Sequence, residues 1–104
     1  MNPKYKKMLE GMRRKVQASH KKPRDKWMVY ILRCSDGSYY TGITKDLDRR
    51  LKMHNQGKAS RYTRTRRPVR LCYQEACLGR AMSLTRECQI KSLPRSKKEE
   101  LIAG

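Results

Sequence analysis

The longest apolar run in this chain is Trp-Met-Val-Tyr-Ile-Leu at residues 27–32. Consecutive apolar residues rich in β-branched and aromatic types indicate a strand that is buried on both faces. Ser-Asp-Gly-Ser at 35–38 follows as a turn, in which Gly37 can adopt a positive φ. Residues 39–43 then return as a second strand. The folded part of the chain is therefore expected to open with a β-hairpin over residues 27–43.

A helix is expected directly after this hairpin. Thr44 or Asp46 can cap its start, and it should run to about Asn55, where Gly57 supplies a stop. Residues 56–68 are dense in Arg and end in a proline, so they are predicted to form a loop.

The remaining segments predict one more strand and two more helices. Alternation places three apolar residues on one face of the strand: Val69, Leu71 and Tyr73. A helix over about 79–93 carries an apolar stripe formed by Ala81, Leu84 and Cys88. Ser96 and Glu99 suggest a capping box for a short helix to about residue 103. The predicted order is β-β-α-β-α-α, an α+β fold with a small, three-stranded, mostly antiparallel sheet flanked by helices.

Positive charge dominates the composition. Lys and Arg number 27 against 9 Asp and Glu, which gives a formal net charge of +18. No stretch approaches the roughly 18 apolar residues of a membrane span, so a membrane protein is excluded. The charge favours nucleic acid or another polyanion as partner. The simplest class with this composition is a nonspecific RNA-binding or ribosome-associated protein.

The chain divides into a basic N-terminal arm, residues 1–26, and a domain, residues 27–104. Apolar residues at helical spacing predict an amphipathic helix in the arm, with a disordered tail as the alternative. The four cysteines form no C-x-x-C pair, which argues against a zinc site. No secretory signal precedes them, so reduced thiols and a cytoplasmic location are expected.

Two polar residues fall where the core should be. Arg50 and His54 lie on the face of the 46–55 helix that Leu47 and Leu51 define. Burying them is costly unless they serve a site. The alternative is an Arg whose stem packs while its head reaches water, with a His bonded to a backbone carbonyl.

Three further residues have more than one interpretation. Glu87 borders the apolar stripe of its helix, where it can pair with Lys91 or hold one hard divalent cation. Tyr30 and Tyr40 lie in partner strands across a short turn. Their roles could be core packing, base stacking or acid–base chemistry.

Taken together, these residues resemble the motifs of the GIY-YIG nuclease superfamily. The resemblance rests on Met-Val-Tyr at 28–30, Tyr-Thr-Gly at 40–42, Asp-Leu-Asp-Arg-Arg-Leu at 46–51 with His54, and Glu87. It covers about residues 27–101. The pattern is similar to the small stand-alone bacterial members and to the nuclease domain of the excision-repair incision enzyme.

The resemblance implies roles for the catalytic residues. Tyr30 would act as general base or position the water, helped by His54, and Tyr40 would orient water or phosphate. Arg50 would bind the scissile phosphate. Arg50, the metal and a bond to His54 are expected to favour the Tyr30 phenolate. Glu87 would be the one protein ligand of a single Mg or Mn ion.

Two further expectations concern the site. Gly42 would leave room for a close approach. Residues near the site helix are expected to bind nucleic acid through charge, with a tyrosine that can stack on a base: Lys52, Lys58, Arg61, Tyr62, Arg64, Arg66 and Arg67.

The function implied is a metal-dependent endonuclease that hydrolyses phosphodiester bonds. DNA is favoured over RNA, in single-stranded or branched form, in repair or recombination. A protein partner could supply specificity. The alternative is a catalytically inactive module that binds RNA or DNA.

Overall fold

The computed structural model describes residues 26–104. The arm predicted for residues 1–26 therefore lies outside the described residues, except for Lys26. Three strands form one antiparallel sheet in the order β2-β1-β3. Strand β1 (Lys26–Arg33) lies at the centre, between β2 (Tyr39–Thr44) and β3 (Arg70–Leu78). The α+β class, with a small antiparallel sheet flanked by helices, is confirmed.

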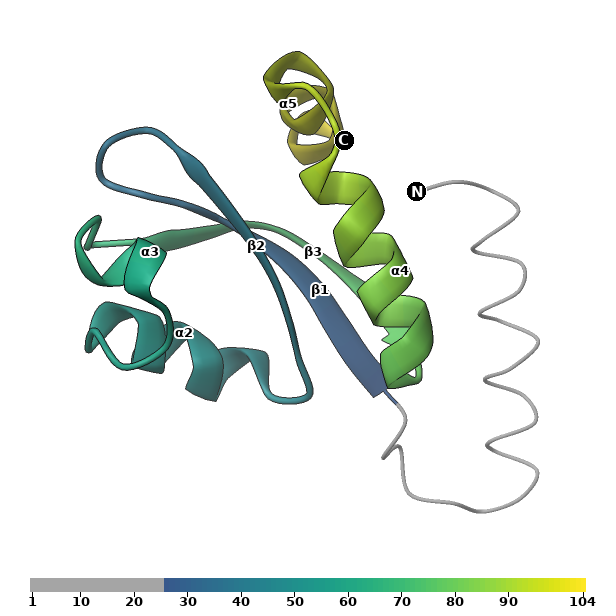
Figure 1. The fold of residues 1–104 in the computed structure, drawn as a ribbon, viewed down its shortest axis with the longest axis horizontal. Coiled ribbons are helices and arrows are strands. Elements are labelled where there is room, and N and C mark those ends of the chain that lie inside the picture. The colour runs from purple at the N-terminus through teal and green to yellow at the C-terminus, as the bar shows by residue number, and fades with distance from the viewer. Residues whose placement is uncertain (1–25) are drawn as a thin grey trace.

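Helices cover both sides of this sheet (Figure 1). Helix α2 (Leu47–Asn55) and the short α3 (Arg61–Arg64) lie on one side. Helices α4 (Arg80–Lys91) and α5 (Arg95–Ala103) lie on the other. Among the described residues, no helix is long and apolar enough to span a bilayer.

The central strand is buried on both faces, as its apolar run predicts. Val29, Tyr30, Ile31 and Leu32 are each exposed by 1% or less. Side chains alternate along a strand, so they enter two separate clusters. We call these the α2 face, with core residues Tyr30, Leu32, Cys34 and Val69, and the α4 face, with core residues Val29, Ile31, Cys77 and Ile90.

The start of α2 and the loop after it differ in detail from expectation. Asp46, not Thr44, caps α2, because its carboxylate accepts the Arg49 N–H at 3.2 Å. The predicted loop contains α3, which the Ser60 side chain caps by accepting the Thr63 N–H. A helix of four residues leaves no periodic pattern in the sequence, which is why the loop prediction missed it.

The prediction that one face of β3 carries Val69, Leu71 and Tyr73 is wrong. Val69 and Leu71 pack on the α2 face, whereas Tyr73 packs on the α4 face. The pairing with β1 shifts register between Ile31 and Leu32. An extra residue in one strand of a pair moves every later side chain to the opposite face.

The predicted stripe of α4 is also wrong, because its three members are exposed: Ala81, Leu84 and Cys88. Ser83 and Ile90 are instead fully buried. Glu87 lies four residues after Ser83 and three before Ile90, so it projects from the side of α4 that faces the sheet.

Helix α5 begins two residues earlier than a capping box starting at Ser96 implies. Pro94 precedes its first turn, and no side chain caps it. Glu99 pairs with Arg95 at 2.9 Å instead of closing a box with Ser96. Proline is well suited to a helix start because its φ is already helical.

Candidate active site

A close contact between the paired strands β1 and β2 lies at the centre of the candidate site. Tyr30 lies opposite Gly42 in the strand register, and its side chain passes directly over that glycine. A Cβ at position 42 would lie 2.6 Å from Tyr30 Oη and 3.1 Å from a ring carbon of Tyr40. Position 42 therefore accepts only glycine without displacing both tyrosines, which agrees with the expected role of Gly42.

A chain of hydrogen bonds leads from Tyr30 through the buried side of α2 into α3. Tyr30 Oη lies 2.9 Å from His54 Nε2, and His54 Nδ1 lies 2.8 Å from Thr63 Oγ1. Thr63 Oγ1 is in turn 2.9 Å from Ser60 Oγ. His54 and Thr63 are fully buried. Sequence reasoning missed Thr63 and Ser60, because Ser and Thr in a basic loop resemble ordinary surface residues.

Burial keeps the first two members of this chain neutral. Desolvation, together with the smaller effect of the neighbouring Arg50 charge, lowers the pKa of His54 to about 4. A neutral imidazole carries one N–H. Either Tyr30 donates to Nε2 while Nδ1 donates to Thr63, or both bonds run in the opposite direction.

The expectation that Arg50, the metal and His54 together favour the Tyr30 phenolate stays a prediction, and in the absence of metal the Tyr30 hydroxyl is held protonated. Burial raises the pKa of Tyr30 to about 12, and the charges of Tyr40 and Glu87 add to the rise. Arg50 opposes it through hydrogen bonding and charge, but the cost of burying a charged oxygen is the largest effect.

Arg50 carries an unsatisfied donor beside this chain. Its Nε is buried and has no hydrogen-bond partner within the described part of the chain. A buried N–H without an acceptor costs roughly 1–3 kcal/mol. Arg50 also lines a cavity of about 340 Å³, together with Lys45 and Arg49. Asp46 lines the cavity too, so its lining carries three cations and one carboxylate, a net positive charge that would attract an anion.

The ring of Tyr40 contacts both the buried Tyr30–His54 pair and the exposed Tyr62. Its ring centroid lies 6.4 Å from that of Tyr30 and 5.0 Å from that of His54. On its other flank the ring stacks on Tyr62 at 6.1 Å. Tyr30, Tyr40 and His54 thus form one aromatic cluster, as the sequence motifs imply.

Glu87, on α4, acts on the same site through its charge. Its charge contributes to the raised pKa of Tyr30, and its side chain is 18% exposed. The i,i+4 pair with Lys91 also forms, at 3.4 Å. Residues 26–104 contain no group of three or more His, Cys, Asp or Glu that could hold a metal. A single accessible carboxylate suits Mg²⁺, which usually keeps several waters and takes one or two protein carboxylates.

Apart from Tyr62, which stacks on Tyr40, the predicted nucleic-acid contacts fall into two groups. Four are exposed on α2, on α3 or on the loop between them: Lys52, Lys58, Arg61 and Arg64. The other two arginines bond within the protein. Arg66 pairs with Asp36 at 3.0 Å, and Arg67 Nε donates to the Arg64 carbonyl at 2.9 Å.

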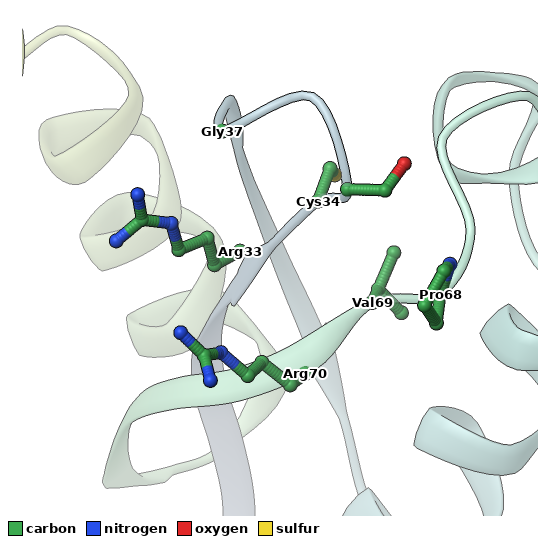
Figure 2. A pocket seen from close by; sticks show the side chains of 7 residues that line it. Arg33, Cys34, Gly37, Pro68, Val69 and Arg70 are labelled. Atoms are coloured by element: carbon green, nitrogen blue, oxygen red, sulfur yellow. The ribbon is translucent and has the colours of Figure 1, made fainter.

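A second basic feature lies at the far ends of β1 and β3. Arg33 and Arg70 are directly opposite in the strand register, and both line an open pocket of about 540 Å³. Figure 2 shows their guanidinium groups pointing to the same side, away from Pro68 and Val69. This pocket contains none of the predicted catalytic residues.

A buried ion pair on the α4 face was also missed. Glu75 is 4% exposed, and its Oε1 accepts from Arg86 Nε at 2.7 Å and from Tyr73 Oη at 3.1 Å. Arg86 directly precedes Glu87, so this pair anchors α4 to β3 next to the candidate metal ligand. An acidic residue at an inward strand position was the available signal, but the bulge in β3 hid which positions point inward.

Comparison with known proteins agrees with this geometry. Residues 26–100 match the GIY-YIG catalytic domain family. The chain belongs to this family. Its members are nucleases that bind nucleic acid and generally depend on a divalent metal, so the predicted resemblance is confirmed.

Several relatives are small proteins of similar length. A UPF0213 protein of Staphylococcus saprophyticus is 47% identical over 79 residues, which cover 76% of this chain and 96% of the relative. A UPF0213 protein of Staphylococcus aureus is 49% identical over 78 residues, with 75% and 95% coverage. This chain is thus similar to small stand-alone bacterial proteins.

Solved structures lead to the same group. The solution structure of a UPF0213 protein from Bacillus halodurans is 46% identical and has a TM-score of 0.50, covering 75% of this chain and 83% of that one. A protein from E. faecalis is 34% identical with a TM-score of 0.53, covering 77% and 85%. The names of these proteins state no substrate.

Proposed function

We propose that this protein is a metal-dependent endonuclease that hydrolyses phosphodiester bonds in single-stranded or branched DNA. The observation that carries the proposal is the Tyr30–His54 hydrogen bond of 2.9 Å beside the unsatisfied Nε of Arg50. A binding module needs no buried proton acceptor next to a phosphate site.

The neutral chain of hydrogen bonds suggests how a water molecule is activated. A tyrosine whose pKa is raised to about 12 is a poor reservoir of phenolate at neutral pH. Tyr30 Oη can instead take a proton from water while its own proton passes to His54 Nε2. Thr63 then accepts the Nδ1–H of His54. No free phenolate forms. The bound phosphate would offset the positive charge that the imidazole carries until the proton passes through solvent to the leaving oxygen.

Bond making and breaking would occur beside Arg50. The water oxygen bonds to phosphorus as the phosphorus–oxygen bond to the leaving strand breaks. The Arg50 guanidinium offers donors to the phosphate oxygens and offsets their growing charge. When bound at Glu87, a Mg²⁺ or Mn²⁺ ion would supply Lewis-acid activation of the phosphate. Tyr40 would orient the water from the rim of the cluster.

The biological setting is proposed from the family resemblance and from charge. Similarity to the excision-repair nuclease domain favours repair or recombination, in the cytoplasm. Exposed cations beside α2 supply sequence-independent attraction to phosphates. A protein partner would select the substrate, since no side chain of the described site is arranged to recognise base edges.

Cleavage of labelled single-stranded, duplex and branched DNA, and of RNA, tests the proposal. Reactions contain Mg²⁺, Mn²⁺ or EDTA, and Glu87→Gln is compared with Glu99→Gln. Both glutamates form i,i+4 pairs on helices, so the changes are matched in charge and setting. We expect metal-dependent cutting that only Glu87→Gln removes, with DNA binding intact. Binding without cutting under either metal would instead support the inactive nucleic-acid-binding module.

A further inference from the structure

The guanidinium group of an arginine lies over an exposed tyrosine ring beside the site. The guanidinium carbon of Arg66 lies 3.8 Å from the centroid of the Tyr62 ring. Arg66 Nε donates to Asp36 Oδ2 at 3.0 Å, and Nη1 donates to the Tyr62 carbonyl at 3.0 Å. The backbone is tied down too, since Ser35 N–H donates to the Arg66 carbonyl at 2.9 Å.

This Arg66–Tyr62 pair continues the aromatic cluster of the catalytic centre outward. Tyr62 stacks on Tyr40 with an interplanar angle of 27°, and Tyr40 lies against His54. The side chains of Arg66 and Tyr62 remain about one third exposed, at 34% and 37%. A series of planar side chains therefore extends from the buried His54 through Tyr40 and Tyr62 to Arg66 at the surface.

A guanidinium fixed in this way is a preformed surface for a nucleobase. Bases stack on aromatic rings and on arginine planes, and such stacking tolerates any base. Most of the entropy of ordering the arginine is already lost in the free protein, because its bonds to Asp36 and Tyr62 hold it. Within residues 26–104, Nη2 of Arg66 has no hydrogen bond, so it can also donate to a phosphate.

We propose that Arg66, supported by Tyr62 and held by Asp36, binds an unpaired nucleobase next to the scissile phosphate. A base inside a duplex has both faces covered by its neighbours, so it cannot lie on this platform. The inference therefore assigns the substrate class as single-stranded nucleic acid or a single-stranded flap. It rests on the proposed function for the position of the scissile phosphate.

The molecule contains a matched arrangement far from the catalytic residues. Arg95 lies over the ring of Tyr39 at 4.6 Å and pairs with Glu99 at 2.9 Å. Tyr39 packs on the α4 face, opposite the face that carries Tyr30 and His54. Arg95 Nη2 also donates to the Gly37 carbonyl at 2.9 Å, next to Asp36, so Arg95→Lys controls both for loss of a ring-stacked arginine and for disturbance of the turn that anchors Arg66.

The test compares a short oligothymidylate with an abasic oligomer of the same number of phosphates, in EDTA, by fluorescence anisotropy. Because both oligomers carry the same number of phosphates, the charge contribution to binding cancels in the comparison. The comparison also does not depend on where the protein binds along the oligomer. We expect the wild type to bind the base-containing strand roughly fivefold or more tightly. Arg66→Lys should bring this ratio close to one, whereas Arg95→Lys should leave it unchanged.

Two outcomes would contradict the proposal that Arg66 binds a nucleobase. A wild-type ratio near one would mean that only the backbone is bound. Equal changes in the Arg66→Lys and Arg95→Lys proteins would mean that the effect is not local. Asp36→Asn, which keeps Arg66 but releases its anchor, should lower the ratio partially, and thermal unfolding checks that each variant folds. Since metal is absent, a protein that never cuts DNA can still pass this test, so failure of the platform and failure of the nuclease are separable.

Discussion

The two faces of the sheet bury polar groups in opposite ways. On the α2 face, Tyr30, His54 and Thr63 form a neutral chain of hydrogen bonds that leads toward the surface. On the α4 face, Glu75 and Arg86 form a charged pair in which Tyr73 also bonds Glu75 Oε1, while the buried Glu75 Oε2 has no hydrogen-bond partner within the described residues. Burial raises the pKa of both Tyr30 and Tyr73 to about 12. The two tyrosines therefore differ in the partner that each hydroxyl bonds, a neutral imidazole for Tyr30 and a charged carboxylate for Tyr73.

The largest effect should appear when each tyrosine loses its hydroxyl. Tyr30→Phe removes the proposed proton acceptor, so cleavage should fall by about 10²–10⁴-fold. Tyr73→Phe removes only a bond to Glu75, so the same rate should remain near that of the wild type. Single-turnover cleavage assays of both variants measure this difference. Equal losses of activity would show that the two faces do not differ in function.

Breaking the ion pair on the α4 face should give the next largest effect. Arg86→Met leaves Glu75 as a buried charge without its partner, which should cost about 3–5 kcal/mol in the free energy of unfolding. The double variant Glu75→Gln with Arg86→Met should recover much of that loss. Urea unfolding measures both. If the double variant is no more stable than Arg86→Met alone, the loss comes from packing instead of charge.

Stability should depend on pH through the α2 face. The unfolded chain protonates His54 near pH 6.5, whereas the folded chain does so only near its pKa of about 4. Between these values the unfolded state binds more protons. Stability contributed by neutral His54 should therefore fall as pH decreases from 6.5 to 4, by at most about 3 kcal/mol. Thermal unfolding across this range should show a weaker pH dependence in His54→Asn.

A smaller loss of stability is expected when the hydrogen bond between His54 and Thr63 is removed. Thr63→Val leaves His54 Nδ1 buried without a partner, which should cost about 1–3 kcal/mol. The exposed Thr65 next to α3 offers a matched control, and Thr65→Val should change stability by less than about 0.5 kcal/mol. Urea midpoints compare the two. Similar values would mean that the Thr63 hydroxyl does not support His54.

The features that sequence reasoning predicted well depend on local pattern. The hairpin followed from one apolar run and a glycine turn, and α2 followed from Leu47, Leu51 and a capping Asp46. The same helix periodicity placed Arg50 and His54 toward the core, and the structure brings both to Tyr30. Apart from α3, the order of strands and helices needed nothing beyond these local signals.

The errors arose where an inward direction depended on distant contacts. The bulge in β3 reversed the faces of its later residues and hid Glu75. In α4, the apolar Leu84 and Cys88 are exposed because Ile90 and the Glu75–Arg86 pair set the rotation of the helix. Periodicity shows that a helix has two sides, but it cannot show which side a neighbouring strand will cover.

Local sequence thus determined which residues form strands and helices and which chemical groups are available. Tertiary packing decided what those groups became: it buried His54 and made it neutral, kept Tyr30 protonated, and turned Glu87 toward the sheet. The physical reason is that pattern depends on neighbours along the chain. Burial, which shifts protonation, depends on segments such as α3 and β3 that lie far away in sequence.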